Sequence, residues 1–462
     1  MSSMNTQALL APWTPAGDDV WDRRKVVHLL RRAAFGGAPA DWDACHKRGL
    51  QGTLRWLFDG PRETPEFTAL LARVGGELLD LGQWDDLRAW WLYRMLHTPA
   101  PLVEKMTLFW HGHFATAGSK VGSAELMQRQ NDTLRKHALG RTRAMLRDLS
   151  RDPAMLIWLD NRQNVKARPN ENYGRELLEL FSLGIGHYSE DDIKSAARAF
   201  TGWHLKGTTF FFNKSQHDEG DKVFLGSSGR FGGDEVIDVI LESRACAAHL
   251  ARKLLTFFLY DAPEPPLVEA FAELLRKSDY DIGAMLRVLF QSKVFFSKKA
   301  YKALIKSPVE LCVGAALATQ GRISTRALGH HAGLMGQSLY FPPSVKGWDG
   351  GRDWINPSRL IARWNFAMAL SSARGPAFGS HIAPAVAAER LGQKSAEDVV
   401  DYYLWSLVQT DVSSDTRARL LDYMERWDRQ PRKKFEVNEQ TLNTKVRGLI
   451  HVIMTSPEYQ VN

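Results

Sequence analysis

The 462 residues include 44% hydrophobic and 24% charged positions, the composition of a globular protein with a substantial core. The net charge of +8 is dispersed, and the longest basic run is Arg432-Lys433-Lys434, so no nucleic-acid-binding stripe is indicated. Three widely spaced cysteines without a Cys-x-x-Cys motif indicate neither a disulfide framework nor a thiolate zinc site. Cys246 and Cys312 lie in apolar helical stretches, where we expect them to be buried.

Two further features bear on where the protein works. No run of about 18 uninterrupted apolar residues occurs, so no membrane span is expected. Residues 1–20 lack the charged and apolar regions of a signal peptide, which makes a cytoplasmic location the default expectation.

Helical periodicity of apolar residues dominates the chain. Proline, glycine and capping residues mark many helix ends, such as Asn170 before Glu171 and the capping box of Ser189 with Asp192. The predicted helices are 21–34, 84–97, 101–114, 123–139, 142–149, 171–183, 190–201, 234–242, 244–259, 265–277, 281–290, 297–318 and 324–335.

Irregular segments interrupt this pattern. Residues 203–234 are rich in glycine and contain the β-prone run 208–213, which predicts a short hairpin and an ordered loop that forms a lid or a pocket wall. Residues 338–356 form a second irregular stretch, and 371–393 are expected to be a loose loop before two or three final helices.

The expected fold is therefore mainly α, a large multi-helix globular bundle with a small β-hairpin and loop insertion. We expect a single domain over residues 1–462. Residues 1–100 and 394–462 are candidate helical subdomains, and 203–234 is the insertion.

His111 and His113 form a His-x-His pair in the segment 109–114. This spacing is common among metal ligands, because neutral imidazole binds Zn, Fe, Cu or Ni. On a regular helix the two rings point to different faces, so both would reach one metal only if the helix frays at Gly112. The alternative is a hydrogen-bonded histidine in the core.

Acids and amides gather around the helix that begins at Glu171. Arg175 can pair with Glu171 and with Glu179 at i, i+4 spacing. The charges are either surface ion pairs, or a buried brace or pocket wall, because leucines surround them. Nearby amide and carboxylate oxygens suit a hard cation or a polar substrate. These are Asp160, Asn161, Asn164, Asn170 and Asn172.

The glycine-rich insertion carries His217-Asp218 and Lys222. An adjacent histidine and aspartate can serve as a ligand and a general base, and the lysine can stabilise an anion. An exposed turn is the alternative. Trp203 and His204 precede this loop, and Trp348 and Trp354 flank a second glycine-rich run, where paired tryptophans can form a sugar-stacking platform or cap the core.

Taken as an ordered set, these motifs resemble the domain of unknown function 1800 family of uncharacterised bacterial proteins. The matching segments are His28–Arg32 with Phe35-Gly36, Phe109–Phe114, Pro169–Leu177, Thr201–Trp203, His217-Asp218 with Lys222 and Leu225-Gly226, and Gly347–Asn356. The resemblance implies a mostly helical fold with a polar pocket. It also implies a partner, because family members are often encoded beside a phosphatase- or sulfatase-like protein that is frequently exported. Export together with that partner is the alternative to a cytoplasmic location.

The leading hypothesis is a metal-assisted hydrolase that acts on a polar, glycan-like substrate. A divalent metal, held by His111, His113, His217 and Glu171 or Asp218, would lower the pKa of a bound water. Glu176 and Asp218 would act in acid–base catalysis, and Arg175 or Lys222 would stabilise negative charge. Predicted substrate contacts are Asn170, Asn172, Trp203, Trp348 and Trp354. The rival hypothesis is a non-catalytic helical scaffold, or a partner or maturation protein for the co-encoded enzyme.

Overall fold

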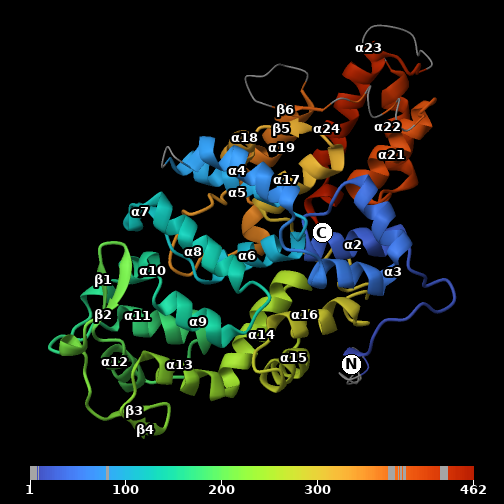
Figure 1. The fold of residues 1–462 in the computed structure, drawn as a ribbon. Coiled ribbons are helices and arrows are strands. Elements are labelled where there is room, and N and C mark those ends of the chain that lie inside the picture. Colours follow the sequence, from blue (N-terminus) through green and yellow to red (C-terminus); the bar gives the residue numbers. More distant parts are fainter. Residues whose placement is uncertain are drawn as a thin grey trace.

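The computed structural model describes residues 8, 10–79, 83–372, 380–382, 384, 388, 392–426 and 435–462. These residues are mainly helical, as predicted (Figure 1). Within them, no helix combines the length and the apolar character needed to cross a membrane.

Helices of the first half of the chain follow one another through short connections. They are α2 (Arg23–Ala33), α3 (Pro39–Asp59), α4 (Pro65–Leu79), α5 (Trp84–His97), α6 (Pro101–His113), α7 (Gly118–Val121), α8 (Ala124–Lys136), α9 (Thr142–Ser150), α10 (Pro153–Trp158), η1 (Asn161–Gln163), α11 (Glu171–Glu176), the π-helix η2 (Leu177–Ser182) and α12 (Glu190–Ala199).

The second half continues in the same way after the glycine-rich insertion. Its helices are η3 (Lys214–Gln216), α13 (Gly233–Glu242), α14 (Arg244–Phe258), α15 (Pro265–Lys277), α16 (Ile282–Gln291), α17 (Pro308–Thr319), α18 (Thr325–Leu334), η4 (Gly351–Ile355), α19 (Pro357–Ser371), α21 (Ala396–Val408), α22 (Ser414–Glu425), α23 (Glu439–Thr441), the π-helix η6 (Leu442–Val446), α24 (Arg447–Thr455) and η7 (Pro457–Gln460).

The described strands form three small antiparallel pairs. Strands β1 (Trp203–Lys206) and β2 (Thr209–Phe212) make the hairpin predicted in the insertion, and β3 (Lys222–Phe224) pairs with β4 (Ser227–Gly229). Strand β5 (Arg322–Ile323) pairs with β6 (Ser380–His381). The rest of the loop predicted at 371–393 falls largely outside the described residues.

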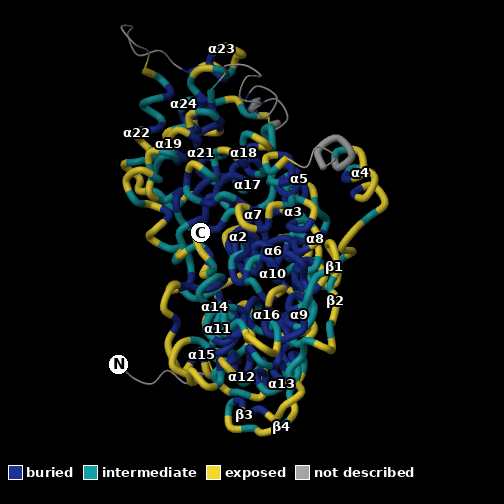
Figure 2. The backbone as a smooth tube through the Cα atoms, turned by 90° about the vertical axis from the view of Figure 1, so that its left-hand side faces the viewer, coloured by how far each residue is buried: buried dark blue, intermediate teal, exposed yellow. Residues whose placement is uncertain are grey.

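The molecule is elongated, with the insertion and the C-terminal helices at opposite ends. The β3–β4 pair lies at one end, and α21, α22 and α24 lie at the other (Figures 1 and 2). Buried apolar side chains from Trp13 to Tyr459 form a connected core along this length. Cys45, Cys246 and Cys312 are all buried free thiols, as expected for the last two.

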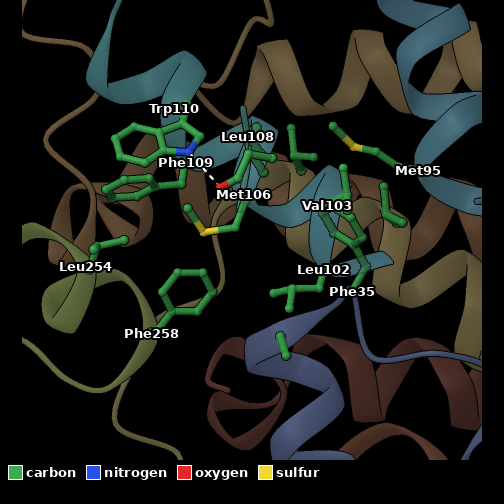
Figure 3. Packing of buried hydrophobic residues seen from close by; sticks show 14 of the residues in the cluster. Phe35, Met95, Leu102, Val103, Met106, Leu108, Phe109, Trp110, Leu254 and Phe258 are labelled. Atoms are coloured by element: carbon green, nitrogen blue, oxygen red, sulfur yellow. Dashed lines mark hydrogen bonds between the residues drawn. The ribbon is translucent and has the colours of Figure 1, made fainter. Parts of the chain in front are cut away.

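Helix α6 runs through the middle of this core. Its residues from Leu102 to His111 are all buried. Figure 3 shows Met106 and Phe109 packing towards Phe258 of α14, while Val103 lies on the side of Met95 from α5. A helix buried all round has no solvent-facing side on which to place polar groups. Every charged or polar side chain on α6 therefore needs a partner inside the protein.

One predicted helix is wrong at its start. Residues 297–306 form turns, and α17 begins only at Pro308, with Ser307 as its N-cap. A residue before proline is disfavoured in the α conformation, so the chain cannot continue helically into Pro308. Lys302 also has a left-handed φ of 53°.

Three long helices, α3, α4 and α19, were not predicted individually. Gly49 interrupts α3 with a φ of 71°, and Gly52 follows it, which weakens the helical signal. Helix α19 follows a tryptophan- and glycine-rich segment whose pattern indicated a loop.

Glu104 of α6 is the centre of a buried ion cluster. Its carboxylate accepts hydrogen bonds from Arg94 of α5 at 2.6 Å and from Arg135 of α8 at 2.7 Å. Trp91 Nε1 donates to it at 2.9 Å. Burial opposes ionisation of Glu104, but the two guanidinium groups outweigh this effect and hold its pKa below the usual value. The cluster joins α5, α6 and α8.

We expect Glu104→Gln to lower the free energy of unfolding by about 3 kcal/mol, because it removes the one fully buried counter-charge that Arg94 and Arg135 share. Their other ion-pair partners, Glu63 and Asp132, are half-exposed. Urea unfolding of the two proteins measures the difference. Exposed Glu125 on α8 provides the matched control, and Glu125→Gln should change stability by less than about 0.5 kcal/mol. Equal losses in both variants would contradict the assigned role of Glu104.

Candidate functional site

A cavity of 340 Å³ lies between α6, α14 and the irregular segment 337–354. Its volume is within the range of small-molecule sites. Residues from all three parts line it, together with the segment before α17. They include Phe109, Gly112, His113, Arg252, Lys253, Phe257, Asp261, Glu310, Gln337, Lys346, Trp348, Asp349 and Trp354.

A close backbone contact holds the 337–354 segment against α6. Gly347 has a φ of 86°, and a Cβ placed on it would lie 2.2 Å from the Gly112 carbonyl oxygen. No side chain fits in that space, so glycine is required at position 347. This close approach places the neighbouring Trp348 against the C-terminal end of α6.

His111 fixes the same segment from inside the core. Its Nε2 accepts a hydrogen bond of 3.0 Å from the backbone N–H of Tyr340, a buried residue with a left-handed φ of 65°. That nitrogen therefore has no free lone pair for a metal. The ring also contacts Trp91, Tyr340 and Trp348, with centroids 5.2–5.7 Å apart. Of the alternatives predicted for His111, the structure shows the hydrogen-bonded core histidine.

His113 is buried at the cavity wall and has one nitrogen without a partner. Its Nε2 lies 3.1 Å from the Phe181 carbonyl oxygen, so Nε2 carries the proton and donates. Nδ1 then presents a lone pair, and it has no hydrogen-bond partner in the described structure. Burial, reinforced by the charge of Lys253, holds the pKa of His113 well below its usual value. The imidazole is a neutral acceptor.

Lys253 of α14 brings an uncompensated charge to this wall. Its Nζ makes no hydrogen bond or ion pair with any residue that the structure describes, although the side chain is half-buried. Burial lowers its pKa, and repulsion from Lys346 lowers it further. A half-buried ammonium without a partner is costly, and an anion would offset that cost.

The two predicted tryptophans both line the cavity. Trp348 is half-buried, while Trp354 is buried and 5% exposed. Lys346 pairs with Asp349 at 2.6 Å, so its charge is already compensated. The cavity therefore combines aromatic walls with the half-buried ammonium of Lys253 and the buried acceptor of His113, and exposed Arg252 and Asp261 lie on its rim.

The predicted cluster around Glu171 lies outside this cavity. Arg175 makes a double hydrogen bond with Glu190 of α12, at 2.8 and 2.9 Å, and reaches Glu171 at 3.3 Å. The predicted pair with Glu179 is replaced, because the helix widens to a π-helix at Leu177 and Glu179 accepts instead from Tyr188. Arg175 is thus a brace between α11 and α12.

The predicted substrate residues near this brace have local partners. Asn170 caps α11 by accepting from the Asn172 N–H at 3.0 Å, and Asn172 donates to the Leu159 carbonyl at 3.1 Å. Trp203 is buried against Phe200, with ring centroids 5.0 Å apart. Half-buried Glu176 does not line the cavity, and burial, then the charge of Glu179, raises its pKa.

The predicted site residues of the glycine-rich insertion are used in hydrogen bonds that fix the conformation of residues 217–222. Asp218 accepts two hydrogen bonds from Arg198, at 2.7 and 3.2 Å, and these bonds lower its pKa. Buried Lys222 donates to the Asp218 and Gly220 carbonyls at 2.7 and 3.0 Å. His217 Nδ1 lies 2.8 Å from the Thr201 carbonyl. His217 and Asp218 border a shallow surface depression, separate from the cavity.

The four predicted metal ligands are not brought together. His113 faces the cavity, His111 binds Tyr340, Glu171 pairs with Arg175, and His217 lies in the insertion. Across the part of the chain that the structure describes, no three His, Cys, Asp or Glu side chains form a group able to hold a metal ion.

Lys253 and Arg252 were missed by the sequence-based prediction. They sit in a helix of otherwise ordinary amphipathic pattern, and no motif marks them. Helical spacing does place Lys253 beside the buried positions Leu250 and Leu254, at the edge of the apolar face. That position is the one signal that could have drawn attention to it.

Comparison with known proteins gives one match. Residues 28–461 match the family described as protein of unknown function (DUF1800), and the chain belongs to this family. No curated protein and no solved structure gives a significant match.

The buried state of His111 has a consequence for stability at low pH. Burial lowers its pKa from 6.5 to about 3, so between these values the unfolded chain binds a proton that the folded protein does not. Stability should fall as the pH falls through this window, and His111 alone contributes about 1.4 kcal/mol per pH unit to the slope.

We expect His111→Gln, which keeps an acceptor for the Tyr340 N–H, to reduce that slope by this amount in urea unfolding at pH 4.5 to 6. His46→Gln is the control, because His46 is exposed and should leave the slope as in the wild type. An unchanged slope in His111→Gln would show that His111 is not a buried neutral histidine.

Proposed function

We propose that this member of the DUF1800 family binds a compact ligand with an anionic group and hydroxyl groups, such as an acidic sugar, in the cavity between α6 and α14. The observation that carries the proposal is Lys253, an unpaired ammonium on a wall shared with His113 and two tryptophans. This set of groups is typical of a binding site: a half-buried charge, a hydrogen-bond acceptor and an aromatic surface.

The charge of Lys253 selects an anion. Removing an ammonium from water without a counter-ion is costly, and a carboxylate, sulfate or phosphate group beside Nζ restores that interaction. Exposed Arg252 lies on the same rim and adds positive potential where the ligand enters. A neutral ligand would gain neither the charge interaction with Lys253 nor the attraction to Arg252.

His113 and the tryptophans suit the rest of such a ligand. The lone pair on His113 Nδ1 can accept a hydrogen bond from a hydroxyl group, which satisfies a nitrogen that is otherwise buried and unpartnered. Trp348 and Trp354 offer apolar ring surface to the C–H face of a sugar.

Hydrolysis of the ligand stays a prediction, and it finds less support than binding. A histidine whose pKa lies well below 6.5 accepts a hydrogen bond but is a weak base. The predicted catalytic groups Arg175, Glu176, Asp218 and Lys222 do not line the cavity. Binding therefore accounts for the geometry most directly.

We expect the wild-type protein to bind glucuronate and not methyl glucoside in isothermal titration calorimetry. Lys253→Met should weaken glucuronate binding about 10–100-fold, because a hydrogen bond to a charged group contributes about 1.5–3 kcal/mol. Lys277→Met is the control, since Lys277 is an exposed residue of α15 outside the cavity. Equal binding of both sugars, or full binding by Lys253→Met, would contradict the proposal.

Partner binding is a second candidate function, and an exposed apolar stripe on α19 favours it. Ile361, Trp364 and Met368 are 41–56% exposed at i, i+3 and i+7 spacing. Val452 of the adjacent α24 is also exposed. Such a stripe is typical of a docking surface. Its proposed partner is the phosphatase- or sulfatase-like protein that the family resemblance implies.

Met368→Glu should abolish co-purification of the chain with that co-encoded protein, because a charge in the centre of an apolar contact must be desolvated. Val223→Glu is the control, since Val223 is equally exposed but lies on β3 in the insertion. Retention of the complex by Met368→Glu, or no complex with the wild type, would argue against this role.

A further inference from the structure

Five buried cationic side chains gather where the N-terminal helix meets the C-terminal segment. They come from α2, α6 and α19 and from the segment just before α17, and each is at most 9% exposed. We call them the basic cluster. It consists of Arg31, Arg32, Lys105, Lys306 and Arg363.

The basic cluster has few negative partners. Among the described residues its one ion pair joins Lys105 to Glu310. The other members donate to oxygens that do not belong to Asp or Glu side chains: Arg31 to Gln409 Oε1 (2.7 Å) and the Leu407 carbonyl (2.6 Å), Arg32 to the Ala300 carbonyl (2.7 Å) and Asn462 O (3.0 Å), Lys306 to the Tyr459 carbonyl (2.5 Å), and Arg363 to the Lys306 carbonyl (2.6 Å). Two further nitrogens of Arg32, Nε and Nη1, are buried without a partner.

This imbalance is unfavourable unless something compensates it. Buried charges are normally paired, since the loss of hydration costs several kcal/mol for each ion. Burial and the positive charges of Arg31, Lys302 and Arg363 hold the pKa of Lys306 well below its usual value. A negative charge beside Lys306 would favour its protonated form and offset part of this repulsion.

A small cavity exists at this place. It has a volume of 20 Å³, and its lining includes Arg31, Lys306, Tyr459 and Asn462. That volume is enough for one water molecule or one monatomic ion. Lys306 has three N–H donors, and the Tyr459 carbonyl uses one of them. Nζ also lies 3.8 Å from the centre of the Tyr459 ring, and no other hydrogen bond to a described residue uses its remaining donors.

We propose that this cavity holds a small monovalent anion, chloride, between Arg31 and Lys306. Glu310 also lines the cavity, but its carboxylate already accepts from Lys105 and from the Ser307 N–H at 2.7 Å. Polyatomic anions exceed the volume. The bound ion offsets part of the charge of the basic cluster and ties α2 to the segment that ends at Asn462.

Chloride should stabilise the folded protein, because it binds the folded state and has no site in the unfolded chain. We expect the melting temperature to rise by a few degrees, and to saturate, as sodium chloride replaces sodium gluconate at constant ionic strength. Gluconate is too large for the cavity and controls for screening. Lys306→Met should lose this response, while Lys277→Met, altered at an exposed position of α15, should retain it.

Crystals grown in sodium bromide give a direct test on the wild-type protein, whether or not Lys306→Met folds. An anomalous peak between Arg31 and Lys306 is expected. Water alone in the cavity, without an anomalous peak there, would overturn the proposal. A chloride response that persists in Lys306→Met would also overturn it. Neither result involves Lys253, so this test is separate from that of ligand binding.

Discussion

The complete burial of α6 is the constraint on which the rest of the structure depends. A helix without a solvent-facing side must find an internal partner for each polar group, and those partners come from distant parts of the chain. Glu104 binds arginines of α5 and α8, Lys105 pairs with Glu310 of α17, and His111 accepts a hydrogen bond from the backbone of Tyr340. His113, which lines the cavity, differs because its buried Nδ1 has no hydrogen-bond partner among the described residues. Helix α6 therefore carries both the polar residues that hold the fold together and a residue of the candidate site.

Much of the fold could be predicted from periodicity. The helix at 84–97 was predicted to the residue, and the hairpin in the insertion was expected from its β-prone run. Sequence patterns did not predict helices correctly where contacts between distant parts of the chain determine the structure. The start of α17 depends on Ser307 and Pro308, and the glycines of α3 hide a helix that packing stabilises.

The candidate site was predicted in part. The predicted metal ligands and catalytic residues were expected to lie at one site, but the structure separates them. Residues of α6 and the Trp348 segment meet at the cavity, whereas Arg175 and Asp218 brace α12 and its following loop. Sequence spacing could not distinguish a charge that awaits a ligand from one that already has a partner. Lys253 is the opposite case, a cavity residue that was not predicted. Its surroundings come from residues far away in the chain, and no sequence motif marks it.

The contact between Arg32 and Asn462 spans 430 positions of the chain, and Trp42 packs against Trp405 in the same region. A ribosome releases α2 long before it makes these partners. The contacts of Arg32 and Trp42 with these residues can therefore form only after most of the described chain has been synthesised. Closing so long a loop costs entropy that local helices do not incur. We therefore expect α2 to dock late in folding, and its contact with Asn462 holds these two distant parts of the chain together.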